Sequence, residues 1–206
     1  MHIRCAYAFL LAAVLSACES RESASLTPSS VGESVSATTV VDSVLPVEEA
    51  LRRFRADIPS AASHLSGGAS TRDELVKSFM RALQQADTTS LGQMLLTRAE
   101  FAYLYYPTSR ASRAPYEESP ELNYFRSREH TGKGIRRAIT LLGGRSIRYE
   151  GYSCDPRTRR EGDNILWGPC IVNADTGTGP SVELSLFGTI IERGGHFKFL
   201  SYANQL

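Results

Sequence analysis

The apolar residues of this chain have helical spacing in the first half of the domain and strand-like spacing in the second half. This order limits the fold more than any single motif does. From Pro46 to Gly144 the apolar residues recur with the spacing of one helix face. From Ile147 to Tyr202 they alternate with polar residues, as in half-buried strands. This order leaves no room for repeated strand-helix-strand crossovers. The sequence therefore predicts an α+β fold, with N-terminal helices packed on a curved antiparallel sheet of about four strands.

Capping signals mark where several helices begin. Thr71 with Glu74, and Thr97 with Glu100, have the spacing of a capping box, in which the hydroxyl and the carboxylate each accept a hydrogen bond from a backbone amide. The segment that follows Glu100 also fits a strand, but the capping box before it favours a helix. The predicted helices cover residues 46–54, 71–86, 88–95, 101–106 and 120–142.

Glycine positions indicate how the strands of the second half turn. Gly194 and Gly195 have the composition of a two-residue hairpin turn, which would pair Ile190 with Phe199. In the same register a further glycine, Gly188, lies opposite a serine and marks a bend in the sheet. The predicted strands cover residues 147–152, 165–172, 182–190 and 196–202.

The N-terminus has the features of a bacterial lipoprotein signal. The apolar run 6–14 is much shorter than the roughly 20 residues that a spanning helix needs, and it is typical of a signal peptide. The residues 15–18, Leu-Ser-Ala-Cys, resemble the lipobox of bacterial lipoproteins, which implies cleavage before Cys18 and lipid on its sulfur. An ordinary secretory signal is the alternative. We expect a signal peptide over 1–17 and a protein of the cell envelope, held by lipid on the extracytoplasmic side of an inner or an outer bacterial membrane.

Residues 18–45 contain no aromatic residue and are rich in Ser, Thr, Ala, Glu and Val. This composition predicts a disordered tether with a reach of roughly 25 to 30 Å, followed by a single α+β domain over 46–206. The net charge of +1 gives no electrostatic reason to expect a nucleic-acid partner.

The cysteines indicate one structural pair. Of the four cysteines, Cys5 leaves with the signal peptide and Cys18 carries the lipid, so Cys154 and Cys170 remain. A hairpin centred on Gly162 places these two opposite each other, and an oxidising compartment favours a disulfide between them. A redox or metal role is the alternative, although no CxxC motif is present.

Three segments carry a resemblance to a known fold. The capped helix 71–86, the Leu-Gly-Gln-Met-Leu segment 91–95 and the closing strand 197–202 resemble the nuclear-transport-factor-2-like cone fold, which ketosteroid isomerase shares. The resemblance covers roughly residues 70–206. It implies a concavity between helices and sheet, and a superfamily that includes isomerases, dehydratases, cyclases and binding modules.

The expected concavity suits a small apolar ligand. Four aromatic residues are its predicted lining: Tyr103, Tyr149, Trp167 and Phe199. An isomerase-type or dehydratase-type enzyme is the alternative, and it would need a buried carboxylate beside an acidic donor such as tyrosine. Asp87 and Glu100 are the carboxylates considered, and both are better explained as helix caps. No catalytic residues are assigned, and the sequence favours a binding or scaffold module over an enzyme.

Basic residues supply the candidate partner contacts. Arg157, Arg159 and Arg160 lie at the tip of the hairpin whose base the disulfide would hold, a sensible surface for an envelope protein partner. Histidines are isolated, so no metal site and no cofactor is expected. A further basic set lies in or near the last predicted helix, where a solvated helix face is the simpler interpretation: Arg126, Arg128, Lys133, Arg136, Arg137, Arg145 and Arg148.

Overall fold

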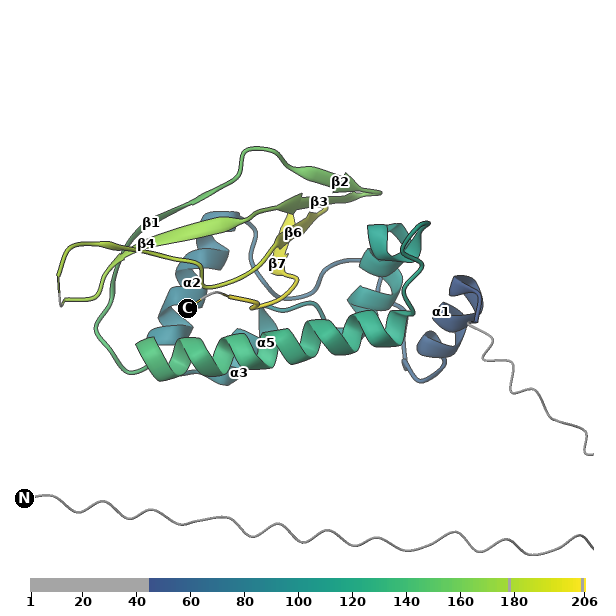
Figure 1. Cartoon of the computed structure of the whole chain (residues 1–206), viewed down its shortest axis with the longest axis horizontal. Helices are drawn as coiled ribbons and strands as arrows, with labels where there is room; N and C mark the ends of the chain where they lie inside the picture. Colours follow the sequence, from purple (N-terminus) through teal and green to yellow (C-terminus); the bar gives the residue numbers. More distant parts are fainter. Residues whose placement is uncertain (1–44, 178, 205) are drawn as a thin grey trace, which may run out of the picture. The chain divides into compact units, whose positions relative to one another are not determined.

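The computed structural model describes residues 45–177, 179–204 and 206 (Figure 1). The expected signal peptide, the lipid site at Cys18 and almost all of the expected tether lie outside the described residues. Within the described ranges, no helix has both the length and the apolar character needed to cross a membrane.

Five α-helices precede the strands in the described part of the chain, as the spacing of the apolar residues predicts. The segment after Glu100 is helical too, but it forms a π-helical turn, Phe101–Tyr105, and two 3-10 turns, Tyr106–Thr108 and Arg110–Ser112. The α-helices are Val47–Ala56 (α1), Arg72–Gln84 (α2), Thr88–Gln93 (α3), Arg98–Glu100 (α4) and Pro120–Leu142 (α5).

The two predicted capping boxes differ in how they form. At α4 both halves are present: the amide of Glu100 donates to Thr97 Oγ1 at 3.1 Å, and the Thr97 amide donates to Glu100 Oε2 at 2.7 Å. At α2 the Thr71 hydroxyl caps the helix as expected. The Glu74 carboxylate instead accepts from the amide and hydroxyl of Ser70. At α2 the glutamate thus accepts from the residue before the N-cap, Ser70, and not from the N-cap residue Thr71 as predicted.

The strands form two small open antiparallel sheets, in the orders β1-β4-β5 and β2-β3-β6-β7. The prediction of one sheet with about four strands is wrong in this respect, because two predicted strands are interrupted. Gly168 and Pro169 separate β3 from β4, and proline has no amide to donate to a neighbouring strand. The strands are Arg148–Cys154 (β1), Arg159–Glu161 (β2), Asn164–Trp167 (β3), Cys170–Asp175 (β4), Val182–Leu184 (β5), Ile190–Arg193 (β6) and His196–Phe199 (β7).

The disulfide between Cys154 and Cys170 is present, and it lies where one sheet passes into the other. β1 pairs with β4 up to these two residues, and β2 pairs with β3 around the turn that contains Gly162. The two pairs are thus halves of one long hairpin, interrupted on both strands. A covalent link that closes a loop of this length stabilises a domain by up to about 3 kcal/mol.

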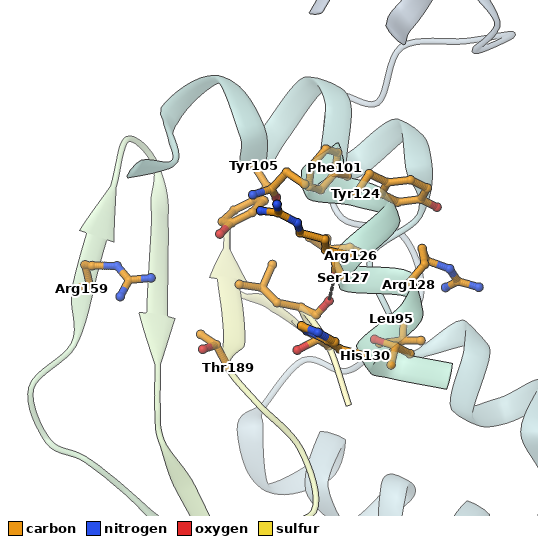
Figure 2. Close-up of a pocket in the computed structure, with 15 residues that line it drawn as sticks. Leu95, Phe101, Tyr105, Tyr124, Arg126, Ser127, Arg128, His130, Arg159 and Thr189 are labelled. Atoms are coloured by element: carbon orange, nitrogen blue, oxygen red, sulfur yellow. Dashed lines mark hydrogen bonds between the residues drawn. The ribbon is translucent and has the colours of Figure 1, made fainter. Parts of the chain in front are cut away.

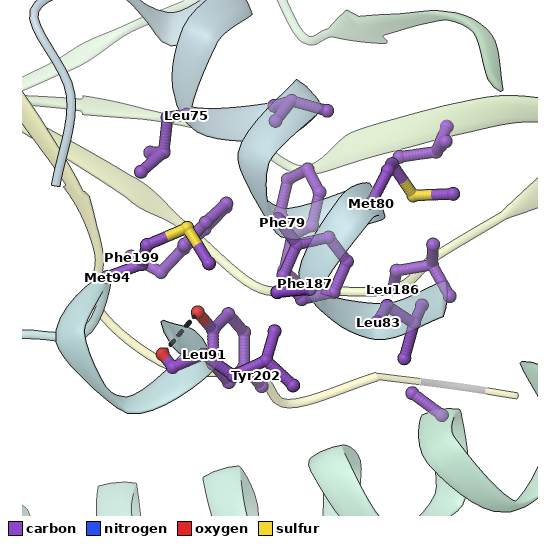
Figure 3. Close-up of a cluster of buried hydrophobic side chains, with 14 of the residues drawn as sticks. Leu75, Phe79, Met80, Leu83, Leu91, Met94, Leu186, Phe187, Phe199 and Tyr202 are labelled. Carbon is purple, nitrogen blue, oxygen red and sulfur yellow. Dashed lines mark hydrogen bonds between the residues drawn. The ribbon is translucent and has the colours of Figure 1, made fainter. Parts of the chain in front are cut away.

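The main core fills the space between α2, α3 and the strands (Figure 3). Phe79 of α2 lies against Phe187, Phe199 and Tyr202, with ring centroids 5.2 to 5.4 Å apart. The Tyr202 hydroxyl donates to the carbonyl of Leu91 at 2.8 Å. These rings occupy the place where the sequence predicts a concavity for an apolar ligand.

The C-terminal segment packs closely on α5, which is the long green helix of Figure 1. A Cβ atom added at Gly134 would lie 1.7 Å from the carbonyl oxygen of Tyr202. The Tyr202 amide donates to the hydroxyl of Thr131, and the side-chain amide of Asn204 donates to the Gly134 carbonyl. Glycine is required at this position because backbone lies directly against it.

Candidate functional site

The four predicted lining residues lie in the packed parts of the molecule. Phe199 is completely buried in the main core, and Tyr149 is partly buried against that core. Trp167 lies under the guanidinium of Arg72, and its indole donates to Glu192. Tyr103 belongs to other apolar clusters, with the Arg55 guanidinium above its ring. None of the four is among the residues that line the groove described below.

The carboxylate of Glu100 is buried, with only 1 % of its side chain exposed. Its Oε1 accepts from the amide and hydroxyl of Ser66, at 2.6 and 3.1 Å. Its Oε2 accepts from the Thr97 amide and, at 2.8 Å, from the ammonium of Lys198, which is equally buried. Burial alone would raise the pKa of Glu100, but Lys198 and these amides outweigh burial and hold the pKa below its ordinary value. With both oxygens fully bonded, Glu100 is a structural anion.

Glu161 is the second carboxylate of interest, because it is buried and incompletely bonded. Its Oε1 accepts from Nε of Arg159 at 2.8 Å, whereas its Oε2 has no partner among the described residues. Burial, together with the charge of Glu161, raises the pKa of the nearby Tyr105 phenol to about 12. Tyr105 therefore stays protonated at neutral pH and is available as a hydrogen-bond donor.

Asp87 has the cap role that its position predicts. It begins α3, and its carboxylate accepts from the amides of Thr89 and Ser90 and from the Ser90 hydroxyl. These hydrogen bonds, the Ser90 hydroxyl first, lower the pKa of Asp87.

A groove of about 310 Å³ lies between α5 and the strands (Figure 2). Tyr105 and Phe101 border one end of it, and Figure 2 shows Arg126 and Arg159 entering it from opposite sides while Arg128 points away. Its other lining residues are Leu95, Leu96, Asn123, Tyr124, Ser127, His130, Thr131, Thr189, Leu200 and Ser201. No lining residue is acidic, so the groove offers arginine, hydroxyl and amide donors around a partly apolar floor.

Other hollows have a different chemistry. The one beside α1, about 650 Å³, is lined by Glu48 and Glu117 as well as Arg113. A smaller one beside the start of α2 is lined by Asp73, Arg72 and Tyr152. In the described part of the chain, no cluster of three or more His, Cys, Asp or Glu residues could hold a metal ion.

The predicted arginine tip is divided by the fold. Arg159 lines the groove, whereas Arg157 is 88 % exposed and pairs with Asp155. Arg160 is exposed on the following position of β2. The basic set of α5 contributes Arg126 and Arg128 to the same groove. The structure thus brings together arginines that the sequence assigns to two separate surfaces.

The buried Lys198 is a residue that sequence reasoning missed. It alternates in β7 with Phe197 and Phe199, so its side chain is expected on the solvent side of the strand. That side is covered because the segment around Ala69 pairs with Phe197, and the carbonyl of Ser66 accepts from the Lys198 ammonium at 2.7 Å. Burial of the Lys198 ammonium is offset by its ion pair with Glu100 and its hydrogen bond to Ser66, and the sequence does not show that pairing.

Comparison with known proteins adds no identity to these observations. No protein-family model, curated protein or solved structure matches this chain. The chemistry of the groove is therefore the ground for a functional assignment.

Proposed function

We propose that this chain is a lipid-anchored lipoprotein of the bacterial cell envelope that acts as a binding module, with the groove between α5 and the strands as its binding surface. The observation that carries the proposal is the contrast between two regions. The expected interior concavity is filled by the rings of Phe79, Phe187, Phe199 and Tyr202, whereas the groove is open and lined by donors. A ligand or an envelope protein partner has access to the second region only.

The N-terminal residues and the cysteines support the proposed location. The Leu-Ser-Ala-Cys segment ending at Cys18 supports lipid attachment. The disulfide between Cys154 and Cys170 supports an oxidising compartment outside the cytoplasm, since such bonds persist there. Residues 18–45 would then let the domain reach partners within a tether length of the membrane.

We extend the proposal to the fold family. Helices that precede antiparallel strands, with α2 packed against them through Phe79, are consistent with the nuclear-transport-factor-2-like cone. The long hairpin is interrupted beyond Cys154 and before Cys170, where a curved, cone-like sheet could bend. This likeness concerns fold and leaves the activity open.

One observation favours the alternative of a small isomerase-type or dehydratase-type enzyme. Glu161 is a buried carboxylate with an unpartnered oxygen near the protonated phenol of Tyr105. However, Glu161 does not line the groove, and its other oxygen accepts a hydrogen bond from Arg159. Exchange of a carbon-bound proton of the ligand with deuterated solvent would distinguish this enzyme from a binding module.

Cys18→Ala is expected to move the protein from the membrane fraction to the soluble fraction, because the only predicted lipid attachment atom is removed. The measurement is immunoblotting of fractionated cells. Cys5→Ala is the matched control, since Cys5 would leave with the signal peptide and its loss should not change fractionation. Continued membrane fractionation of Cys18→Ala would overturn the lipid anchor.

A photoreactive phenylalanine analogue in place of Tyr105, which borders the groove and is of similar size, is expected to form an ultraviolet-dependent adduct in intact cells. The same amino acid at Arg136, exposed on α5 but not part of the groove lining, is the control and should form none. Intact mass measurement detects a small ligand as well as a protein. Equal labelling at both positions, or none at Tyr105, would count against the groove as the binding surface.

A further inference from the structure

We infer that the groove binds an anionic ligand, with a carboxylate or phosphate-type oxyanion held between the guanidinium groups of Arg126 and Arg159. This inference rests on the proposed function, and it names the chemistry that the same groove recognises. Figure 2 shows the two side chains entering the groove from α5 and from β2.

The charge of the lining sets this groove apart. Arg126, Arg128 and Arg159 line it together with His130, and no carboxylate does. Arg126 and Arg159 each have a carboxylate partner outside the lining, Glu118 and Glu161, so what faces the groove is their N–H donors with no acidic acceptor beside them. Donors of this kind favour an anionic ligand over a cationic one.

The two arginines keep most of their donors free. A guanidinium has five N–H groups. Arg159 uses its Nε on Glu161, and Arg126 uses one Nη1 bond on Glu118, with no further hydrogen bond of either side chain within the described residues. The remaining fork of each side chain has the geometry that binds two oxygens of a carboxylate or phosphate at once.

Arg159 is held in position before any ligand arrives. Its partner Glu161 has only 5 % of its side chain exposed, and the Glu161 carbonyl accepts from the Thr108 hydroxyl at 3.0 Å. Gly162 in the adjoining turn lies against the same threonine, where an added Cβ atom would meet Thr108 Cγ2 at 2.7 Å. A guanidinium fixed in this way loses less conformational entropy on binding.

Neutral groups complete the site. The phenol of Tyr105 is a donor at neutral pH, and the hydroxyls of Ser127 and Thr189 also line the groove. Leu95 and Leu200 supply an apolar floor. A volume of about 310 Å³ accommodates one sugar-sized or amino-acid-sized group and excludes a whole macromolecular segment. The ligand is therefore a small anion, or the anionic end of a larger molecule.

The test is isothermal titration of the detergent-solubilised full-length protein with three probes: inorganic phosphate, glucuronate and neutral glucose. Phosphate or glucuronate is expected to bind and glucose is not. Arg126→Gln and Arg159→Gln should each weaken binding about tenfold, because each removes a charge-assisted pair of hydrogen bonds. The matched control Arg136→Gln makes the same charge change on α5 away from the groove, and binding should be unchanged.

Because Arg159 also neutralises the buried Glu161, Arg159→Lys serves as a second variant that keeps the charge and loses the fork. It should remain folded and bind more weakly than the wild type. Preference between phosphate and glucuronate tells which oxyanion the groove selects. Equal loss in Arg136→Gln, or no binding of either anion, overturns the inference. If the cross-link at Tyr105 still forms in that case, the groove binds a neutral ligand and the proposed function stands.

Discussion

Lys198→Met is expected to lower the free energy of unfolding by about 3 to 5 kcal/mol, because it leaves the Glu100 carboxylate buried without its charge partner. Both side chains are only 1 % exposed, so water cannot replace the lost ammonium. The same ammonium donates to the Ser66 carbonyl, which would also lose a partner. Urea unfolding at neutral pH measures the effect.

Two variants make this test specific. The double variant Glu100→Gln with Lys198→Met removes both charges and should recover part of the loss, since a buried pair without its charges is less costly than one isolated charge. Lys133→Met removes a lysine from the exposed pair with Glu129 and should change stability little. If Lys198→Met matched Lys133→Met, the buried pair would not contribute as described.

The same pair determines a dependence on pH. The folded-state pKa of Glu100 lies below its ordinary value of 4.5, so its contribution to stability is fully present above that value and is lost as the pH falls through the folded-state pKa. Acid titration of the wild type should therefore show stability falling below about pH 4.5. Glu100→Gln removes this part of the slope.

Local signals in the sequence were sufficient for most of the helices. A capping box requires only two residues three positions apart, so Thr97 and Glu100 were enough to predict a helix start there. The start of α5 after Ser119 was predictable from the sequence in the same way. The register of the last hairpin was also predictable: Ile190 pairs with Phe199 because the turn at Gly194 and Gly195 fixes it.

Features that depend on contacts between distant segments were not predictable in the same way. The division into two sheets depends on Gly168 and Pro169, which end β3 before β4 begins and leave these two strands in different sheets. The groove requires α5 to lie beside β2, which places Arg126 near Arg159 although 33 positions separate them in the sequence. Aromatic residues such as Phe199 were assigned to a pocket, but the apolar pattern that lines a pocket is the same as the pattern that fills a core.

Gly134→Ala is the second substitution with a large expected effect. Alanine favours a helix over glycine by about 1 kcal/mol, so helix propensity alone predicts a gain in stability. The added methyl would lie 1.7 Å from the Tyr202 carbonyl oxygen, and this oxygen belongs to backbone that cannot turn aside as a side chain would. The contact between α5 and the C-terminal segment would have to open. We expect a net loss of about 1 to 3 kcal/mol.

Gly132→Ala is the matched control, because it makes the same change two residues away on the same helix. There the new methyl meets only the flexible end of Arg136, at 3.4 Å, so helix propensity should dominate and stability should rise by about 0.5 to 1 kcal/mol. Opposite signs for the two variants in thermal and urea unfolding are the expected result. If both variants were more stable than the wild type, the Tyr202 segment would not be in close contact with α5. If both were less stable, α5 would tolerate an added methyl group at neither position. Only the opposite signs are consistent with a glycine selected for close approach of backbone at position 134.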